Sequence, residues 1–217
     1  MTRPDDEVPV TGGSATGNRG VPPVRAGVSQ RELRLAHRLL VFTGEGKGKS
    51  TAAFGMGLRA WAQGWSTGVF QFVKSAKWRT GEAAAYAALD ELHRTTGQGG
   101  PVEWHTMGSG WTWLRATQDT DPAALARAGW ERVAEQLEQG VHRLYILDEF
   151  SYPLARGWVD VDEVLDVLAR RPSPQHVVIT GRGVPEAVRE AADLVTEMTK
   201  IKHPFDSGAK GQPGIEW

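Results

Sequence analysis

Short apolar runs alternate with amphipathic segments along the chain from about residue 31 onward. Apolar runs typical of buried strands lie at 39–43, 67–73, 102–107, 144–147, 176–180 and 194–201. Segments of helical periodicity lie between them, at 49–61, 82–92, 122–139, 161–168 and 185–192. Strands separated by helices of about 10 to 15 residues form right-handed crossover units. The pattern therefore predicts an α/β fold with a mostly parallel sheet and flanking helices.

The first 30 residues follow neither pattern. They contain four prolines and five glycines but no Leu, Ile, Phe, Trp or Tyr. Such a segment cannot bury enough apolar area to offset the entropy that it would lose on ordering. We predict a flexible tail over residues 1–28 and a single domain over residues 29–217. The alternative is a lid, formed together with residues 29–38, that orders over a bound ligand.

A glycine-rich turn joins the first predicted strand to the first long helix. Its sequence is Thr43-Gly44-Glu45-Gly46-Lys47-Gly48-Lys49-Ser50-Thr51. In a P-loop, small residues let backbone N–H groups converge on phosphate oxygens, a lysine neutralises phosphate charge and a hydroxyl binds magnesium. Gly48, Lys49 and Ser50 supply these parts, although Thr43 stands where a glycine usually opens the motif. The turn predicts a nucleotide phosphate site, and with the parallel sheet we expect a P-loop NTPase (RecA-like) fold.

Charged residues follow two other predicted strands, at the sheet edge where ligands of such folds bind. Asp148 and Glu149 end the fourth predicted strand, and an acidic pair there in a P-loop protein holds magnesium directly or through water. Arg182 follows the fifth strand between two glycines, where it could contact a phosphate or simply be a solvated turn residue. Ser50, Asp148 and Glu149 are therefore candidate metal ligands.

Two tryptophans, Trp111 and Trp113, stand in a glycine-rich stretch after the third predicted strand. Indoles beyond a strand end are typical of a surface for a large planar ligand. Indoles that fold back into the core fit the same spacing equally well. The spacing alone leaves both interpretations open.

The composition narrows the classes of function. The 217 residues include 25 Lys and Arg against 26 Asp and Glu, so the chain lacks the surplus of positive charge that non-specific nucleic-acid binding needs. No cysteine is present, which excludes a disulfide scaffold, a zinc ribbon and a thiol nucleophile. Neither a secretory signal nor an apolar window of about 20 residues occurs. We expect a cytoplasmic protein that binds neither nucleic acid nor membrane.

In order and spacing together, these motifs resemble the P-loop class of ATP:corrinoid adenosyltransferases. The resemblance extends over residues 39–217 and includes the phosphate loop, Gly110-Trp111-Thr112-Trp113, Leu147-Asp148-Glu149, Ile179-Thr180-Gly181-Arg182-Gly183 and Lys202-His203-Pro204-Phe205-Asp206-Ser207-Gly208. It implies transfer of the 5′-deoxyadenosyl group of ATP to Co(I) of a corrinoid, with release of triphosphate. Because Co(I) is a strong nucleophile, such an enzyme needs to position two reactants and stabilise the leaving polyphosphate.

The resemblance also implies roles for the motif residues. Lys49 and the rest of the loop would bind the triphosphate with Mg²⁺ as cofactor, held by Ser50 and Glu149 and supported by Asp148. Trp111 and Trp113 would pack on the corrinoid and keep its lower base off cobalt, which eases reduction of Co(II). Trp111 stands where phenylalanine is common, and Glu45 where an amide can stand, so the role of Glu45 is open.

The partners implied by the resemblance are ATP, a corrinoid, an external reductant such as a reduced flavoprotein, and a second copy of the chain in a homodimer. The corrinoid could be a cobyrinic acid diamide, cobinamide or cobalamin. Two other functions fit the phosphate loop. Another P-loop kinase or ATPase would release ADP, and a catalytically silent nucleotide-binding protein would bind ATP without turnover.

Overall fold

The computed structural model describes residues 29–73, 80–107, 121–172 and 174–216. The described residues from Leu35 onward belong to one compact unit. Helix α1 (Gln30–Leu35) lies almost entirely before that unit in the sequence and is considered by itself. The functional argument below concerns the compact unit.

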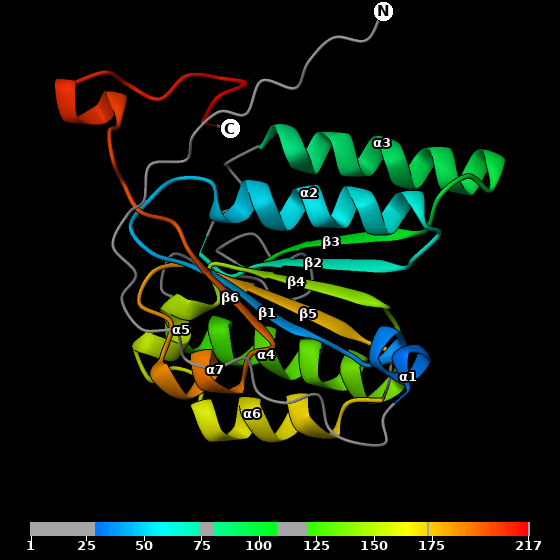
Figure 1. Cartoon of the computed structure of the whole chain (residues 1–217). Helices are drawn as coiled ribbons and strands as arrows, with labels where there is room; N and C mark the ends of the chain where they lie inside the picture. The colour runs from blue at the N-terminus through cyan, green and yellow to red at the C-terminus, as the bar shows by residue number, and fades with distance from the viewer. Residues whose placement is uncertain (1–28, 74–79, 108–120, 173, 217) are drawn as a thin grey trace, which may run out of the picture. The chain divides into compact units, whose positions relative to one another are not determined.

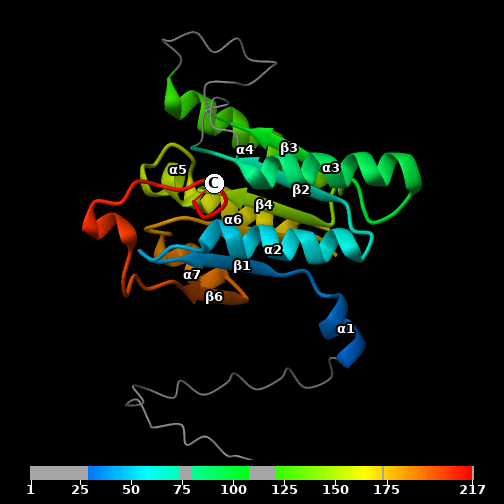
Figure 2. The same ribbon diagram turned by 90° about the horizontal axis from the view of Figure 1, so that it is seen from above.

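Six strands of the described chain form one parallel sheet. They are β1 (Leu39–Thr43), β2 (Thr67–Gln71), β3 (Val102–Thr106), β4 (Leu144–Asp148), β5 (His176–Thr180) and β6 (Leu194–Glu197). Their spatial order is β3-β2-β4-β5-β1-β6, and each neighbouring pair is parallel (Figure 2). Because every pair is parallel, the carboxyl ends of all six strands lie at one edge, and those of β4, β5 and β1 are neighbours there. The predicted α/β fold is confirmed.

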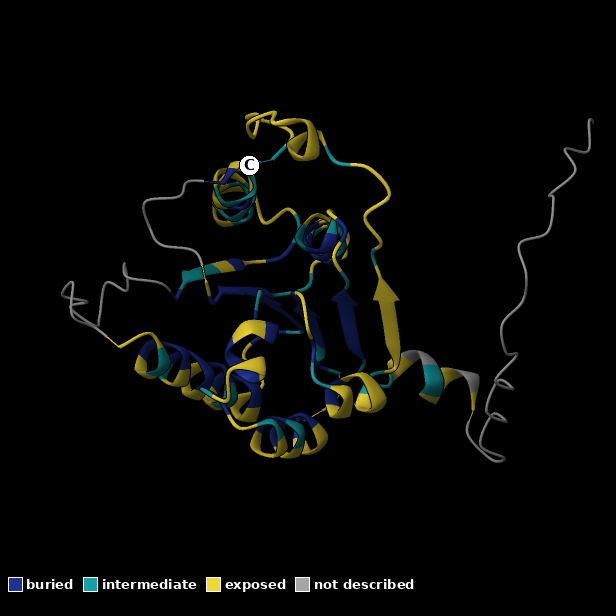
Figure 3. Cartoon of the chain, turned by 90° about the vertical axis from the view of Figure 1, so that its left-hand side faces the viewer, coloured by how far each residue is buried: buried dark blue, intermediate teal, exposed yellow. Residues whose placement is uncertain are grey.

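Helices cover both faces of the sheet (Figure 1). The upper face carries α2 (Lys49–Ala62) and α3 (Gly81–Thr96), and the lower face carries α4 (Pro122–Gln139), α5 (Ser151–Ala155), α6 (Val161–Arg170) and α7 (Glu186–Ala191). Each face has its own hydrophobic cluster of strand and helix side chains. The two clusters bury the central strands on both sides, which explains their nearly continuous apolar sequences (Figure 3).

The strand expected at 194–201 is too long, because β6 ends at Glu197. Its only neighbour in the described sheet is β1, which ends at Thr43, so no strand remains for later residues to pair with. The chain turns instead onto the glycine-rich loop, where the Met198 N–H donates to the Thr43 carbonyl at 2.8 Å. β6 itself is exposed at the sheet edge (Figure 3).

Two further elements were not expected from the pattern. Helix α5 directly follows Glu149, and a 3-10 helix η1 (Pro204–Ser207) lies in the last part of the chain. Both are too short for a hydrophobic periodicity to indicate them. No helix in the described ranges has the length and apolar character needed to cross a membrane.

Candidate functional site

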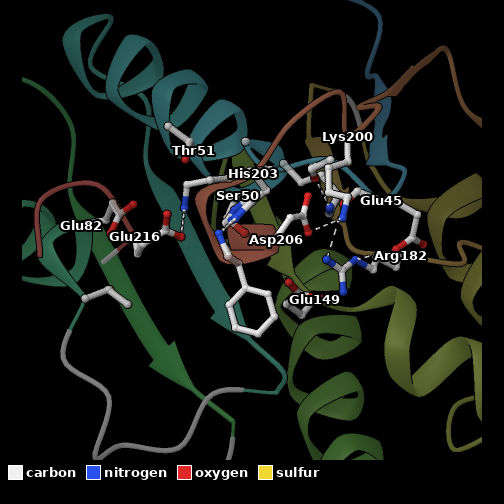
Figure 4. A pocket seen from close by; sticks show the side chains of 16 residues that line it. Glu45, Ser50, Thr51, Glu82, Glu149, Arg182, Lys200, His203, Asp206 and Glu216 are labelled. Carbon is white, nitrogen blue, oxygen red and sulfur yellow. Dashed lines mark hydrogen bonds and ion pairs between the residues drawn. The ribbon is translucent and has the colours of Figure 1, made fainter. Parts of the chain in front are cut away.

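A polar cavity of about 370 Å³ opens at the carboxyl ends of the central strands (Figure 4). It is lined by five parts of the chain: the loop between β1 and α2, the start of α3, the residue after β4, the turn after β5, and the last residues of the chain. The lining residues are Glu45, Gly46, Lys47, Gly48, Lys49, Ser50, Thr51, Thr80, Glu82, Glu149, Arg182, Lys200, His203, Phe205, Asp206 and Glu216. Most of the residues predicted for the site therefore meet in one place.

The loop at 43–51, called the phosphate loop below, packs directly on the chain that leaves β6. The Gly46 N–H donates to the Met198 carbonyl at 2.6 Å. A Cβ atom at Gly44 would lie 2.5 Å from the same oxygen, and one at Gly46 would lie 2.6 Å from it. Gly44 also has a φ of 93°, which side chains other than glycine rarely adopt. The close contact with the Met198 backbone therefore requires glycine at both positions.

Helix α2 begins at this loop with its N–H groups available to an anion. Gly48 occupies the N-cap position with a φ of 110°, and no side chain caps the helix. The first turn contains no acidic residue. An uncapped N-terminus of this kind, with the positive end of the helix dipole, favours phosphate binding. Ser50 and Thr51 lie in this turn and line the cavity.

Lys49 is buried beneath the loop. Its Nζ donates to the Gly44 carbonyl at 2.8 Å and to the Gly46 carbonyl at 2.6 Å. Burial lowers the pKa of Lys49, the neighbouring charge of Arg182 lowers it further, and Glu149 opposes both effects. The ammonium group is thus held by the backbone at the place where a phosphate would approach.

The two acidic residues after β4 have different positions. Asp148 is fully buried, and its carboxylate accepts hydrogen bonds from Gln71 Nε2 at 3.0 Å and from Thr180 Oγ1 at 2.9 Å. Glu149 lines the cavity. Its φ of 59° is unusual for a residue with a side chain, and its N–H donates to Thr180 Oγ1 at 2.9 Å. The Thr180 hydroxyl therefore joins Asp148 to the backbone of Glu149.

This arrangement separates the candidate metal ligands. Ser50 and Glu149 supply hydroxyl and carboxylate oxygens to one cavity, and these are the oxygen donors that Mg²⁺ prefers. Asp148 lies outside the lining of that cavity, with both carboxylate oxygens hydrogen-bonded. Its position fits a residue that orients Glu149. The described residues contain no cluster of three or more His, Cys, Asp or Glu that could hold a metal.

Arg182 faces Glu45 across the mouth of the cavity (Figure 4). Arg182 Nε lies 3.2 Å from Glu45 Oε2, and its terminal nitrogen donates to the Glu45 carbonyl at 3.5 Å. Both side chains are mostly exposed, so the ion pair is screened by solvent and weak. Glu45 therefore has a partner in the structure, and Arg182 lies beside the phosphate loop.

Residues 199–216, called the C-terminal segment below, supply a part of the site for which the sequence motifs assigned no role. Lys47 Nζ lies 2.6 Å from Glu216 Oε2, and Lys200 Nζ lies 2.8 Å from Asp206 Oδ1 (Figure 4). The hydrogen bond from Lys47 lowers the pKa of Glu216, and the one from Lys200 lowers the pKa of Asp206. Gln71 and Thr180 were also missed. Both residues are polar and end an apolar strand, and Thr180 stands in a motif of the family resemblance, but neither was assigned a role.

Trp111 and Trp113 lie outside the described residues. Their expected place near the corrinoid therefore stays a prediction.

A parallel sheet of order β3-β2-β4-β5-β1-β6, with a glycine loop, a buried lysine and a helix N-terminus after β1, defines a P-loop nucleotide-binding protein of the RecA-like type. Within that class, residues 36–217 match the family model described as ATP:corrinoid adenosyltransferase BtuR/CobO/CobP. The chain belongs to this family.

Curated relatives agree with the family match. A corrinoid adenosyltransferase from Pseudomonas aeruginosa is 42% identical over 82% of this chain and 83% of its own length. Corrinoid adenosyltransferases from Escherichia coli K12 and Salmonella typhimurium are 39% and 38% identical, each over 82% of this chain and 85% of their own length. The protein is therefore an enzyme of the corrinoid adenosyltransferase type, as the motifs indicated.

Among solved structures, the flagellar accessory protein FlaH from Methanocaldococcus jannaschii is similar, with 14% sequence identity and a TM-score of 0.48. The match covers 75% of this chain and 72% of that one. The fold assignment rests on the strand order and the loop, and not on this likeness.

Proposed function

We propose that the chain transfers the 5′-deoxyadenosyl group of ATP to Co(I) of a corrinoid and releases triphosphate from the cavity at the phosphate loop. The cobalt–C5′ bond forms as the C5′–O5′ bond breaks, and the electron pair of the broken bond leaves with the triphosphate. Co(I) supplies two electrons and becomes alkylated Co(III), so no protein base is needed. The residues of this chain bind and orient the two substrates, and they stabilise the negative charge on the leaving triphosphate.

The observation that carries the proposal is the convergence of Lys49, the uncapped start of α2 and Arg182 on one polar cavity. Lys49 Nζ would exchange its two carbonyl partners for oxygens of the triphosphate. The N–H groups at the start of α2 would bind the same oxygens. Developing charge on the leaving group would then meet positive groups that are already in position, which is where preorganised electrostatics contribute most.

Ser50 and Glu149 are the residues proposed to hold Mg²⁺. The ion would neutralise part of the charge on the triphosphate oxygens. Asp148 is proposed to act through Thr180, by fixing the backbone from which Glu149 extends. Arg182 would leave Glu45 for a phosphate oxygen, a small change because their ion pair is exposed.

Trp111 and Trp113 are proposed to cover the lower face of the corrinoid, and their support is the resemblance of their motif to the family. The chain contains no cysteine, so reducing equivalents for cobalt must come from elsewhere, and a reduced flavoprotein is the proposed donor. The substrate is proposed to be a cobyrinic acid diamide, cobinamide or cobalamin. We also propose that the protein is a cytoplasmic homodimer. Residues 29–38 would order as a lid over the bound ligand.

Product analysis tests the reaction. The enzyme is incubated with ATP, Mg²⁺ and a chemically reduced corrinoid, and the phosphate products are separated by ion exchange. We expect intact triphosphate in equal amount to a corrinoid whose cobalt–carbon bond breaks in light. Release of ADP without an adenosylated corrinoid would assign the chain to another class of P-loop enzymes.

The role of the tryptophans is tested by Trp113→Ala. If the indole keeps the lower base off cobalt, the rate should fall mainly when reduction starts from Co(II). It should fall less when Co(I) is supplied chemically. Equal losses under the two conditions would indicate that Trp113 only packs.

A further inference from the structure

The C-terminal segment presents an exposed phenyl ring to the nucleotide cavity. Phe205 lines the cavity together with the phosphate loop, yet 73% of its surface is accessible. Leaving a phenyl ring in water forgoes the stabilisation of about 1.5–3 kcal/mol that burial of such a side chain provides. An apolar ring in this position, in an otherwise polar cavity, points to a ligand with an apolar face.

The turn that carries Phe205 is well fixed by its own hydrogen bonds. The Phe205 N–H donates to His203 Nδ1 at 3.1 Å, and its carbonyl accepts from the Gly208 N–H at 2.9 Å. Ser207 Oγ donates to the Pro204 carbonyl at 2.8 Å. These bonds close η1 at both ends and fix the backbone from which the Phe205 ring extends.

The chain is attached to the phosphate loop at Met198, directly before the C-terminal segment, and again after η1. Before it, the Met198 carbonyl accepts from the Gly46 N–H at 2.6 Å. After it, Glu216 Oε2 lies 2.6 Å from Lys47 Nζ. The ion pair between Lys200 and Asp206 joins η1 to the residues before it. The part of the chain that carries the ring is therefore attached to the phosphate loop on both sides of η1, and the ring lines the same cavity as that loop.

The phosphate groups and the base of a nucleotide need different kinds of side chain in this cavity. The phosphate loop, Lys49 and Arg182 account for the polyphosphate. Among the described residues of the lining, Phe205 is the one hydrocarbon ring. A purine base offers a flat π-face that stacks on aromatic side chains, and its stacking depends little on direction.

We propose that Phe205 stacks on the adenine ring of ATP, and that the C-terminal segment is the base-binding wall of the site. The inference rests on the proposed function, because ATP supplies the adenine. Phe205 is a binding residue in this scheme, and it contributes to the choice of a nucleoside triphosphate over a bare polyphosphate.

Equilibrium binding separates this role from simple packing. Calorimetric titrations with Mg²⁺ and without corrinoid, so that no turnover occurs, compare ATP with inorganic tripolyphosphate. Phe205→Ala should weaken ATP binding about tenfold, on the scale of one lost base stack, and should change tripolyphosphate binding less than twofold. Phe205→Trp should restore ATP binding. Ile201→Ala is the matched control, since Ile201 is 90% exposed in the same segment but lies outside the cavity lining.

Four results would overturn the proposal. These are unchanged ATP binding in Phe205→Ala, equal losses for ATP and tripolyphosphate, failure of Phe205→Trp to restore binding, and an effect confined to the KM for the corrinoid. The last result would place the ring against the corrinoid instead. The product assay on the unmodified enzyme is a separate readout, so failure of the adenosyl-transfer function would be seen there whatever the Phe205 variants show.

Discussion

The phosphate loop and the C-terminal segment line the same cavity but are held in opposite ways. The loop is fixed by backbone contacts, by glycines that touch Met198 and by a buried lysine. The C-terminal segment is largely exposed, and side-chain ion pairs help to hold it. Phosphate binding needs several N–H groups aimed at one point, whereas a base needs only a flat surface. In the proposed scheme, the part of the site held by backbone contacts would thus bind the group that requires exact direction.

Lys49→Ala should cause the largest loss. It removes the buried charge from the loop and leaves the Gly44 and Gly46 carbonyls without their partner. We expect kcat for adenosylation to fall about 10²–10³-fold, as for the loss of one preorganised donor in a transition state. Lys202→Ala, an exposed cation outside the cavity lining, is the control. Equal activity of the two variants would remove Lys49 from the mechanism.

Gly46→Ala tests whether the loop depends on contact with Met198. The added Cβ atom would lie 2.6 Å from the Met198 carbonyl, so the loop has to move. We expect a loss of ATP affinity of about tenfold or more, with a lower melting temperature. Gly55→Ala in α2 is matched, because its Cβ atom would meet nothing within 4 Å. It should stabilise the fold by about 0.5–1 kcal/mol. Similar behaviour of both variants would contradict the close contact.

Thr180→Val tests the hydroxyl that joins Asp148 to Glu149. The change leaves a fully buried carboxylate without one donor and the Glu149 N–H without its acceptor. We expect the free energy of unfolding to fall by about 1–3 kcal/mol and kcat to fall with it. Chemical denaturation and steady-state rates measure the two effects. Thr180→Ser keeps the hydroxyl, and an equal loss in that variant would mean that the methyl group matters instead.

Glu216→Gln should have the smallest effect. It breaks an exposed ion pair between the C-terminal segment and the loop. Exposed pairs contribute little and are screened by salt. ATP affinity should weaken by about threefold or less at low ionic strength. The difference from the unmodified enzyme should vanish in 0.5 M salt, where the Debye length is only about 4 Å. A large effect that persists in salt would show that the segment is held as firmly as the loop.

The same contrast explains what the sequence could predict. The phosphate loop is nine contiguous residues, so its chemistry can be inferred locally, and Glu149 and Arg182 follow from the rule that strand ends meet at one edge. Thr180 and Asp148 are 32 positions apart, and Lys47 and Glu216 are 169 apart. Such pairs depend on tertiary packing, which no local pattern reveals. The last strand was predicted too long for a related reason, since its end depends on where β1 ends.

The two hydrogen bonds that Lys49 donates to backbone carbonyls also affect which anions the site can bind. An anion can recruit this ammonium group only if it offers more than the two carbonyl oxygens already bound to it. A chloride ion makes a single weak contact, whereas a polyphosphate brings several charged oxygens that engage the lysine and the start of α2 together. The loop should therefore favour a polyphosphate over a small monovalent anion, because the polyphosphate can engage Lys49 and the N–H groups of α2 together.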